Sequence, residues 1–415
     1  MKGTRLMTAR VREAISYLGP GFFVTIGFVD PGNWATNIAA GSGYGYDLLW
    51  VITLSTLTLI LWQHLAAHLG IVTGKCLPEA VREHLRPASA LLYGTTAMAA
   101  CAATAVAEVL GAAIALNMLF HLPLRAGAIV GALTVGALVW TQGYRSVEKL
   151  VMVFLGAIGL CYLLELVWAK PDLGQTALHL VIPQLSSQSL LVAMGVLGAV
   201  VMPHNLYLHS EVIQRREWHV GEEGEKRRRL RYESLDTLLA MGVGLLINTA
   251  MIVVAAATFH RRHLIVTELP QAAATLAPIA GPLAGPVFAL GLLFAGVSSS
   301  VTASIAGGTV FSGYLGKETD LGGRWFRMGV LLTLVPATVA IMFVRDPLRA
   351  LILSQVCLSA QLPLTMLPIL LLTRSRRVMG TFASGVFETG AMVVTGLGIV
   401  ALNGLLVWQL LGGRF

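Results

Sequence analysis

The chain has 415 residues, of which 56% are hydrophobic and 12% are charged, with a formal net charge of +8. Soluble globular domains contain about 25% charged residues, so this composition excludes an ordinary soluble domain and indicates a membrane protein. Apolar stretches of the length that crosses a bilayer, about 20 residues, recur from near Gly19 almost to the C-terminus.

The hydrophobic pattern predicts an all-α membrane protein with about eleven transmembrane helices. A basic segment precedes the first span without a convincing cleavage site, which favours a cytoplasmic N-terminus over a secretory signal. On this topology 22 of the 29 Lys and Arg residues lie inside, as the positive-inside rule requires. The odd number of spans then places the C-terminus outside the cell (inner) membrane. The spans begin near residues 18, 46, 90, 124, 148, 188, 234, 283, 328, 348 and 380.

A run of basic residues at 226–231 falls between two predicted spans. Such a run could indicate nucleic-acid binding. Its position in a short cytoplasmic loop favours an electrostatic contact with anionic lipid instead. We therefore expect no nucleic-acid partner.

Two of the predicted spans contain a proline and polar residues inside an apolar run. The first span has the motif DPGN at 30–33, and the sixth has MPHN at 202–205. An aspartate at the centre of a membrane helix costs about 2.5 to 3.5 kcal/mol on insertion, so each motif requires a partner or a function. We expect both helices to be broken at these motifs.

The spacing of the motifs predicts an internal repeat. They are 172 residues apart with four spans between them, and a five-helix unit inverts across the membrane when it is repeated. We predict a cytoplasmic segment over 1–17, inverted repeats over 18–170 and 188–374, and an extra helix over 378–415. Paired interruptions at corresponding positions indicate a binding site near the bilayer midplane of a secondary transporter.

The two prolines predict which backbone oxygens face this site. Proline has no N–H, so Pro31 and Pro203 free the carbonyls four residues earlier. These oxygens lie at the C-terminal ends of half-helices, where the helix dipole favours a cation. The predicted metal ligands are the Asp30 carboxylate, the Asn33 amide oxygen, the Met202 thioether and the backbone carbonyls of Gly27 and Ala199.

This ligand set suits a divalent transition-metal ion. One carboxylate among neutral oxygens suits a dication, and the soft thioether favours Mn²⁺, Fe²⁺, Co²⁺ or Cd²⁺ over Mg²⁺ and Ca²⁺. The alternative is that the prolines only kink their helices and that Met202 fills a gap in the packing. The matched pair of motifs favours the metal site.

At these motifs the chain resembles the Nramp family of divalent-metal transporters, whose hallmarks are DPGN in helix 1 and MPH in helix 6. The likeness covers most of the chain and includes GYDLLWV, AEVLGAAIALN and DPLRALILSQVCLSAQLP. It implies a LeuT-type fold, alternating access, and import of metal ions into the cytoplasm with protons as the usual co-substrate. It also implies metal-ligand roles for Asp30, Asn33, Met202 and the Ala199 carbonyl.

Further roles follow from the resemblance alone. It implies that Gln361 can approach the metal and that Glu108 and His204 line the proton route. Apart from the resemblance, the Asp30 carboxylate is itself a candidate proton acceptor. Family members commonly have an aspartate in helix 3 where this chain has Ala105. We therefore expect proton coupling that is weak or altered.

The remaining features favour no other class. No nucleophile-base pair, HExxH or GxSxG motif is present, so neither an enzyme nor a cofactor is expected. The expected partners are divalent metal ions, protons and the lipid bilayer, without an obligate protein partner. A sodium-coupled amino-acid or amine carrier on the same scaffold is the alternative.

Two histidines in the second span have the spacing of a helical metal pair. They are His64 and His68, but the HExxH glutamate is missing and both lie near the cytoplasmic end. The sequence favours a polar pair at the membrane interface. Glu388 in the last span is an intramembrane carboxylate for which the sequence indicates no partner.

Overall fold

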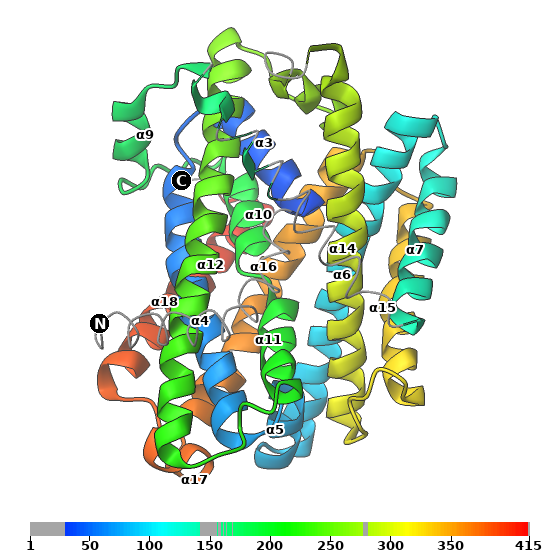
Figure 1. Cartoon of the computed structure of the whole chain (residues 1–415). Coiled ribbons are helices and arrows are strands. Elements are labelled where there is room, and N and C mark those ends of the chain that lie inside the picture. Colours follow the sequence, from blue (N-terminus) through cyan, green and yellow to red (C-terminus); the bar gives the residue numbers. More distant parts are fainter. Residues whose placement is uncertain are drawn as a thin grey trace, which may run out of the picture.

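The computed structural model describes residues 30–141, 156, 159–160, 162, 164–167, 169–276 and 281–413. Within these residues the chain is almost entirely helical and contains no strand. The helices are α3 (Pro31–Tyr44), α4 (Leu49–Thr73), α5 (Leu77–His84), α6 (Pro87–Phe120), α7 (Leu124–Trp140), α9 (Leu173–His179), α10 (Leu190–Val200), α11 (Pro203–Arg215), α12 (Glu223–Thr258), α14 (Ala284–Leu315), α15 (Arg324–Ile341), α16 (Pro347–Arg374), α17 (Arg376–Met379) and α18 (Val386–Leu410). They form one elongated bundle (Figure 1).

The described helices confirm nine of the predicted spans. Eight segments are long and apolar enough to cross a membrane, and α7 is a shorter apolar helix. The first half of the predicted first span and most of the fifth fall outside the described residues. The structure thus has the all-helical, polytopic architecture that the hydrophobic pattern predicts.

The basic run at 226–231 is helical, and the prediction of a loop there was wrong. It forms the first turns of α12, which begins at Glu223. Glutamate, lysine and arginine are good helix formers, and the two glutamates in the first turn complement the helix dipole. The helix therefore continues beyond its apolar part.

Both prolines of the two motifs begin a helix. Pro31 is the first residue of α3, and Asp30 caps that helix in an extended conformation. Pro203 is the first residue of α11, and Met202 precedes it with an extended backbone, φ −80° and ψ 119°. The sixth span is therefore broken into α10 and α11, which follow one another along the bundle (Figure 1).

The centre of the bundle is formed by helices with many small side chains. The most extensive contact joins α6 to α14, and α10 packs mainly against α16. At Gly296 of α14 an added Cβ would lie 2.7 Å from the backbone oxygen of Glu108. Small residues allow such close approach between membrane helices, and the approach positions the polar groups of α6 near the core.

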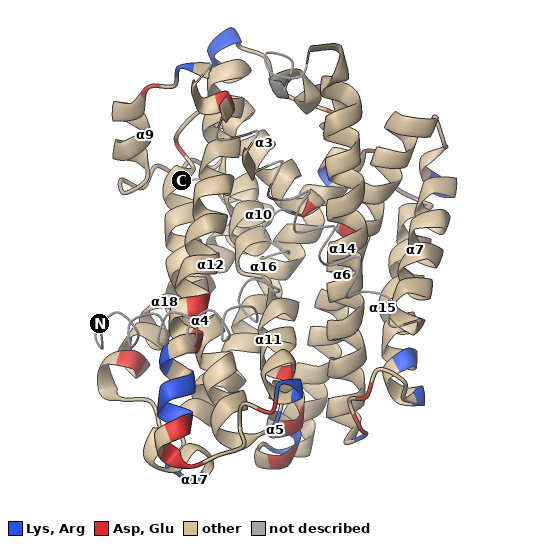
Figure 2. Ribbon diagram, in the orientation of Figure 1, with Lys and Arg blue, Asp and Glu red and all other residues tan. Residues whose placement is uncertain are grey.

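Charge is distributed unevenly along the bundle. Figure 2 shows charged ribbon mainly at the two ends of the helices, with many Lys and Arg residues at the end that contains α5 and α17. Acidic segments also lie away from the ends, at the start of α3, on α6 and on α12 beside α4 (Figure 2). Buried acidic residues at this depth indicate where a polar site is located.

Candidate metal site at the DPGN and MPHN motifs

The DPGN motif is organised around the Asn33 side chain. The Asp30 carboxylate accepts a hydrogen bond from the Asn33 backbone N–H at 2.5 Å and a second from Asn33 Nδ2 at 3.1 Å. Asp30 and Asn33 are completely buried. The first turn of α3 therefore fixes the carboxylate and the amide next to each other.

The same amide joins the first motif to the sixth span. Asn33 Nδ2 donates a hydrogen bond of 2.9 Å to the backbone oxygen of Ala199. Ala199 lies in the last turn of α10, and its carbonyl is the one that Pro203 leaves without a helical partner. The predicted convergence of Asp30, Asn33 and the Ala199 carbonyl is present in the structure, although the contact is made through the amide nitrogen.

Met202 lies at the break between α10 and α11. Its side chain is buried and packs with Ala100, Ala103 and Leu358, and its sulfur accepts a contact from Asn205 Nδ2 at 3.4 Å. The thioether is thus surrounded by α6, α11 and α16 near the core of the bundle. Gly27, the remaining predicted ligand, lies outside the described residues.

A second carboxyl group adjoins Asp30. Glu108 on α6 is completely buried and lies near Asp30 and near Ser299 of α14, but neither of its carboxyl oxygens has a hydrogen-bond partner among the described residues. An added Cβ at Gly111 of α6 would overlap the ring of Pro31, so glycine at that position allows α6 to approach the start of α3. Neither carboxyl has a basic partner among the described residues.

The His204 side chain contacts α6 on the face that contains Glu108. Its Nδ1 lies 3.1 Å from the hydroxyl of Thr104, and Thr104 is one helical turn from Glu108. Ala105 is fully buried on this helix and contributes no titratable group. Asp30, Glu108 and His204 are therefore arranged along one side of α6.

The two glutamines of α16 lie differently from the prediction, which placed Gln361 near the metal. The Gln361 amide nitrogen contacts Thr96 Oγ1 at 3.4 Å, and its oxygen accepts a hydrogen bond from Thr365 at 2.8 Å. It is not brought to the DPGN motif. Six residues earlier, Gln355 is completely buried with its side chain against Gly32. Gln355 was not among the predicted site residues, because the pattern of apolar residues in α16 does not distinguish it from Gln361.

These elements define a class of protein: a polytopic membrane transporter with a polar site where the start of α3 meets the break between α10 and α11. The family model described as Natural resistance-associated macrophage protein-like matches residues 21–409, and the chain belongs to this Nramp family. It is 41% identical over 405 residues to the divalent metal cation transporter MntH of Acidiphilium cryptum, with 97% of this chain and 92% of the relative covered. It is also 41% identical over 407 residues to MntH of Deinococcus radiodurans, with the same coverage.

Solved structures show the same architecture. The crystal structure of the Eremococcus coleocola manganese transporter, in complex with an aromatic bis-isothiourea substituted compound, matches with a TM-score of 0.77 and 27% identity. The match covers 94% of this chain and 86% of that one. Mhp1, a nucleobase-cation-symport-1 family transporter, matches with a TM-score of 0.62 at 16% identity over 94% of this chain and 91% of that one, which shows the fold alone. The predicted LeuT-type fold is confirmed.

Proposed function

We propose that the protein imports divalent transition-metal ions, Mn²⁺ foremost and also Fe²⁺, Co²⁺ and Cd²⁺, into the cytoplasm by alternating access. The observation that supports this proposal best is the Asn33 amide between the Asp30 carboxylate and the Ala199 carbonyl. Two oxygens converge on one donor where the start of α3 meets the end of α10. The names of the MntH relatives and of the manganese transporter with the matching structure support the same cargo.

The amide nitrogen occupies the position that a cation would take between these oxygens. A metal ion cannot bind next to the hydrogens of an NH₂ group, so the Asn33 amide has to turn its oxygen toward the ion. Rotation about the terminal torsion of asparagine achieves this, because that torsion is soft. In the loaded state Asp30, Asn33, Met202 and the Ala199 carbonyl would be ligands, with the Gly27 carbonyl as the fifth.

Our candidate for a side-chain amide of α16 near the ion is Gln355. It contacts Gly32, which belongs to the DPGN motif, whereas the partners of Gln361 are Thr96 and Thr365. We assign the role expected of Gln361 to Gln355. The matched pair of glutamines on one helix makes this assignment testable.

Proton movement would use Asp30, Glu108 and His204. Asp30 and Glu108 are neighbouring buried carboxyl groups, and His204 contacts α6 one turn from Glu108 through Thr104. Two adjacent buried carboxyl groups do not both ionise without a cation, so metal binding would release a proton from this pair. Ala105 supplies no further acceptor, which favours weak or altered coupling.

We further propose an inner-membrane location with the N-terminus in the cytoplasm and the C-terminus outside. The end of the bundle with α5 and α17 is rich in Lys and Arg (Figure 2), which suits the cytoplasmic face. The inverted repeats would extend over 18–170 and 188–374. Pro31 and Pro203 each begin a helix. This shared feature supports the proposed relation between the two repeats.

The test is metal uptake into proteoliposomes that contain the purified protein. We expect Mn²⁺ uptake that Asp30→Ala abolishes, because the dication then faces only neutral ligands in a buried site. The Asp47→Ala variant, which changes a half-exposed carboxylate paired with His179 at 3.7 Å, is the control and should transport normally. Normal Mn²⁺ uptake by the Asp30→Ala variant would contradict the proposal. Sodium-dependent uptake of an amino acid by the wild type, without uptake of metal, would also contradict it.

A further inference from the structure

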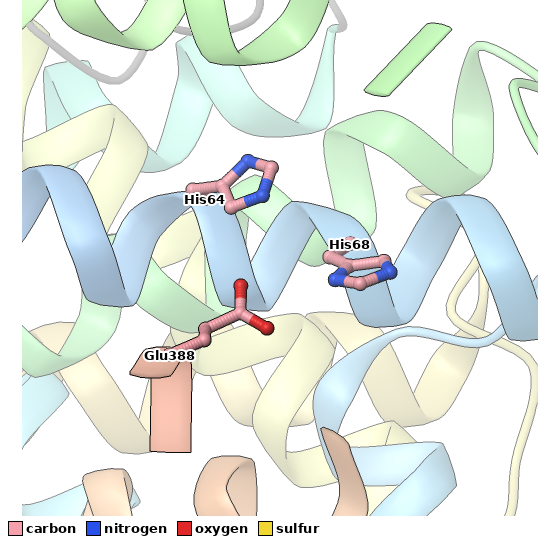
Figure 3. Close-up of side chains that lie close together, drawn as sticks. All are labelled: His64, His68 and Glu388. Atoms are coloured by element: carbon pink, nitrogen blue, oxygen red, sulfur yellow. The ribbon is translucent and has the colours of Figure 1, made fainter. Parts of the chain in front are cut away.

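Three potential metal ligands meet at a second place in the bundle. His64 and His68 lie one turn apart on α4, and Glu388 is in the first turn of α18. One ligand atom from each residue lies within 4.8 Å of those of the other two. Figure 3 shows the Glu388 carboxylate directed toward both imidazole rings. The structure thus places the Glu388 carboxylate near this histidine pair, a proximity that the sequence could not indicate.

His64 is already oriented as a metal ligand would be. Its Nδ1 is 2.5 Å from Glu233 Oε2 on α12, and Glu233 Oε1 accepts a hydrogen bond of 2.7 Å from Thr237. A carboxylate on Nδ1 fixes the tautomer that leaves the Nε2 lone pair available for a metal ion. Histidine ligands of protein metal sites typically have such an acceptor.

His68 provides the second, independent observation. Its side chain is only 7% exposed, and neither ring nitrogen has a hydrogen-bond partner among the described residues. The edge of the Phe382 ring covers it at a centroid distance of 6.5 Å. A buried imidazole without partners is unfavourable, and a metal ion between the three side chains would supply the missing interaction.

The geometry suits one small dication. An ion at the centre of a triangle with 4.8 Å sides would lie about 2.8 Å from each ligand atom, and zinc bonds to nitrogen and oxygen are about 2.0 to 2.2 Å. Each ligand would have to move inward by less than about 1 Å. The Glu388 side chain is half-buried at the end of its helix, so a change of rotamer can make most of this adjustment.

We propose that His64, His68 and Glu388 bind a resident Zn²⁺-like or Co²⁺-like ion that links α4 to α18, apart from the transport site. Two imidazoles and one carboxylate with room for water are a typical ligand set for Zn²⁺. Mn²⁺ binds such a set more weakly than Co²⁺ or Zn²⁺. The proposed cargo would therefore not compete well for this site.

The site lies on different elements from those that form the transport site. It uses α4 and α18, with Glu233 of α12 behind His64, whereas the transport site uses α3, α6, α10 and α16. The extra helix α18 packs chiefly on α16 and only slightly on α4. An ion at this site would add a fixed connection between α18 and α4.

The experiment measures Co²⁺ binding to the purified full-length protein by equilibrium dialysis and by visible absorption. All variants contain Asp30→Ala, which disables the proposed transport site. We expect one Co²⁺ per chain in this background, at least tenfold weaker binding with His68→Ala or Glu388→Gln, and 10- to 100-fold weaker binding with the positioning variant Glu233→Gln. His84→Ala changes an exposed histidine of α5 and is the matched control.

Thermal unfolding provides a readout that does not depend on counting ions. Zn²⁺ should raise the melting temperature of the Asp30→Ala protein and of its His84→Ala control, but not of the Glu388→Gln variant, whose isosteric change preserves the fold. Absence of Co²⁺ binding in the Asp30→Ala background, or equal binding by all variants, would overturn the proposal. Mn²⁺ transport by the wild-type protein does not depend on this second site. Failure of the site proposal is therefore distinguishable from failure of the proposed function.

Discussion

Replacing Asn33 by aspartate tests the bridging role of its amide directly. The amide nitrogen Nδ2 of Asn33 donates to Asp30 Oδ1 at 3.1 Å and to the Ala199 oxygen at 2.9 Å. The Asn33→Asp variant would have an oxygen where this donor is now. The variant should therefore be unstable when empty and recover when a metal ion replaces the donor.

The magnitude follows from the contacts that are lost. Two hydrogen bonds are removed, each worth about 1 kcal/mol net. Two ionised carboxylates with oxygens about 3 Å apart repel by about 5 kcal/mol at an effective dielectric constant of about 20. Uptake of a proton by one carboxyl would relieve that repulsion, so we expect a loss of at least about 2 kcal/mol in the free energy of unfolding.

The assay is thermal unfolding of the purified protein with and without Mn²⁺. We expect a lower melting temperature for metal-free Asn33→Asp and a larger rise with Mn²⁺ than in the wild type. The control is Asn117→Asp, which removes a 2.8 Å amide-to-carbonyl hydrogen bond to Leu122 at an exposed position. It should shift stability by about 0.5 kcal/mol or less. Metal-free Asn33→Asp with wild-type stability would refute the bridging role.

Three further predictions concern transport in proteoliposomes. Met202→Ala should retain some Mn²⁺ uptake, bind Cd²⁺ more weakly and admit more Ca²⁺, because the soft ligand is lost; unchanged Cd²⁺ affinity with continued exclusion of Ca²⁺ would make the sulfur a packing group. Gln355→Ala should reduce Mn²⁺ uptake more than the matched change Gln361→Ala. If Gln361→Ala had the larger effect, Gln361 would be the glutamine of α16 that acts near the metal. With an imposed pH gradient, wild-type Mn²⁺ uptake should acidify the lumen little and Ala105→Asp should raise proton entry; proton entry of one or more per Mn²⁺ in the wild type would disprove the weak coupling.

The main features of the fold were predictable because the bilayer imposes strong rules on sequence. Long apolar stretches predict the spans, and proline predicts that α3 and α11 begin at the two motifs. The loop at 226–231 was mispredicted because charge indicates exposure to water but does not indicate the end of a helix. Helix propensity and hydropathy are separate signals, and they disagree at the start of α12.

The details of the site depend on side-chain directions that hydropathy does not encode. Both Gln355 and Gln361 lie on α16, and only the approach of Gly32 distinguishes them. The orientation of the Asn33 amide depends on the relative positions of α3 and α10, which are far apart in sequence. The contact of Glu388 with α4 likewise arises from the packing of the last helix, so the sequence alone indicates no partner.

The hydrogen bonds of the Asn33 amide bear on how a transport cycle can run without cargo. A carrier that achieves net accumulation has to return across the membrane with an empty site. The Asn33 amide donates to Asp30 Oδ1 and to the Ala199 oxygen, so under the proposed function a return step without cargo would leave neither of these two oxygens without a hydrogen bond. Under the proposed function, this arrangement would favour net accumulation over obligatory exchange of one metal ion for another.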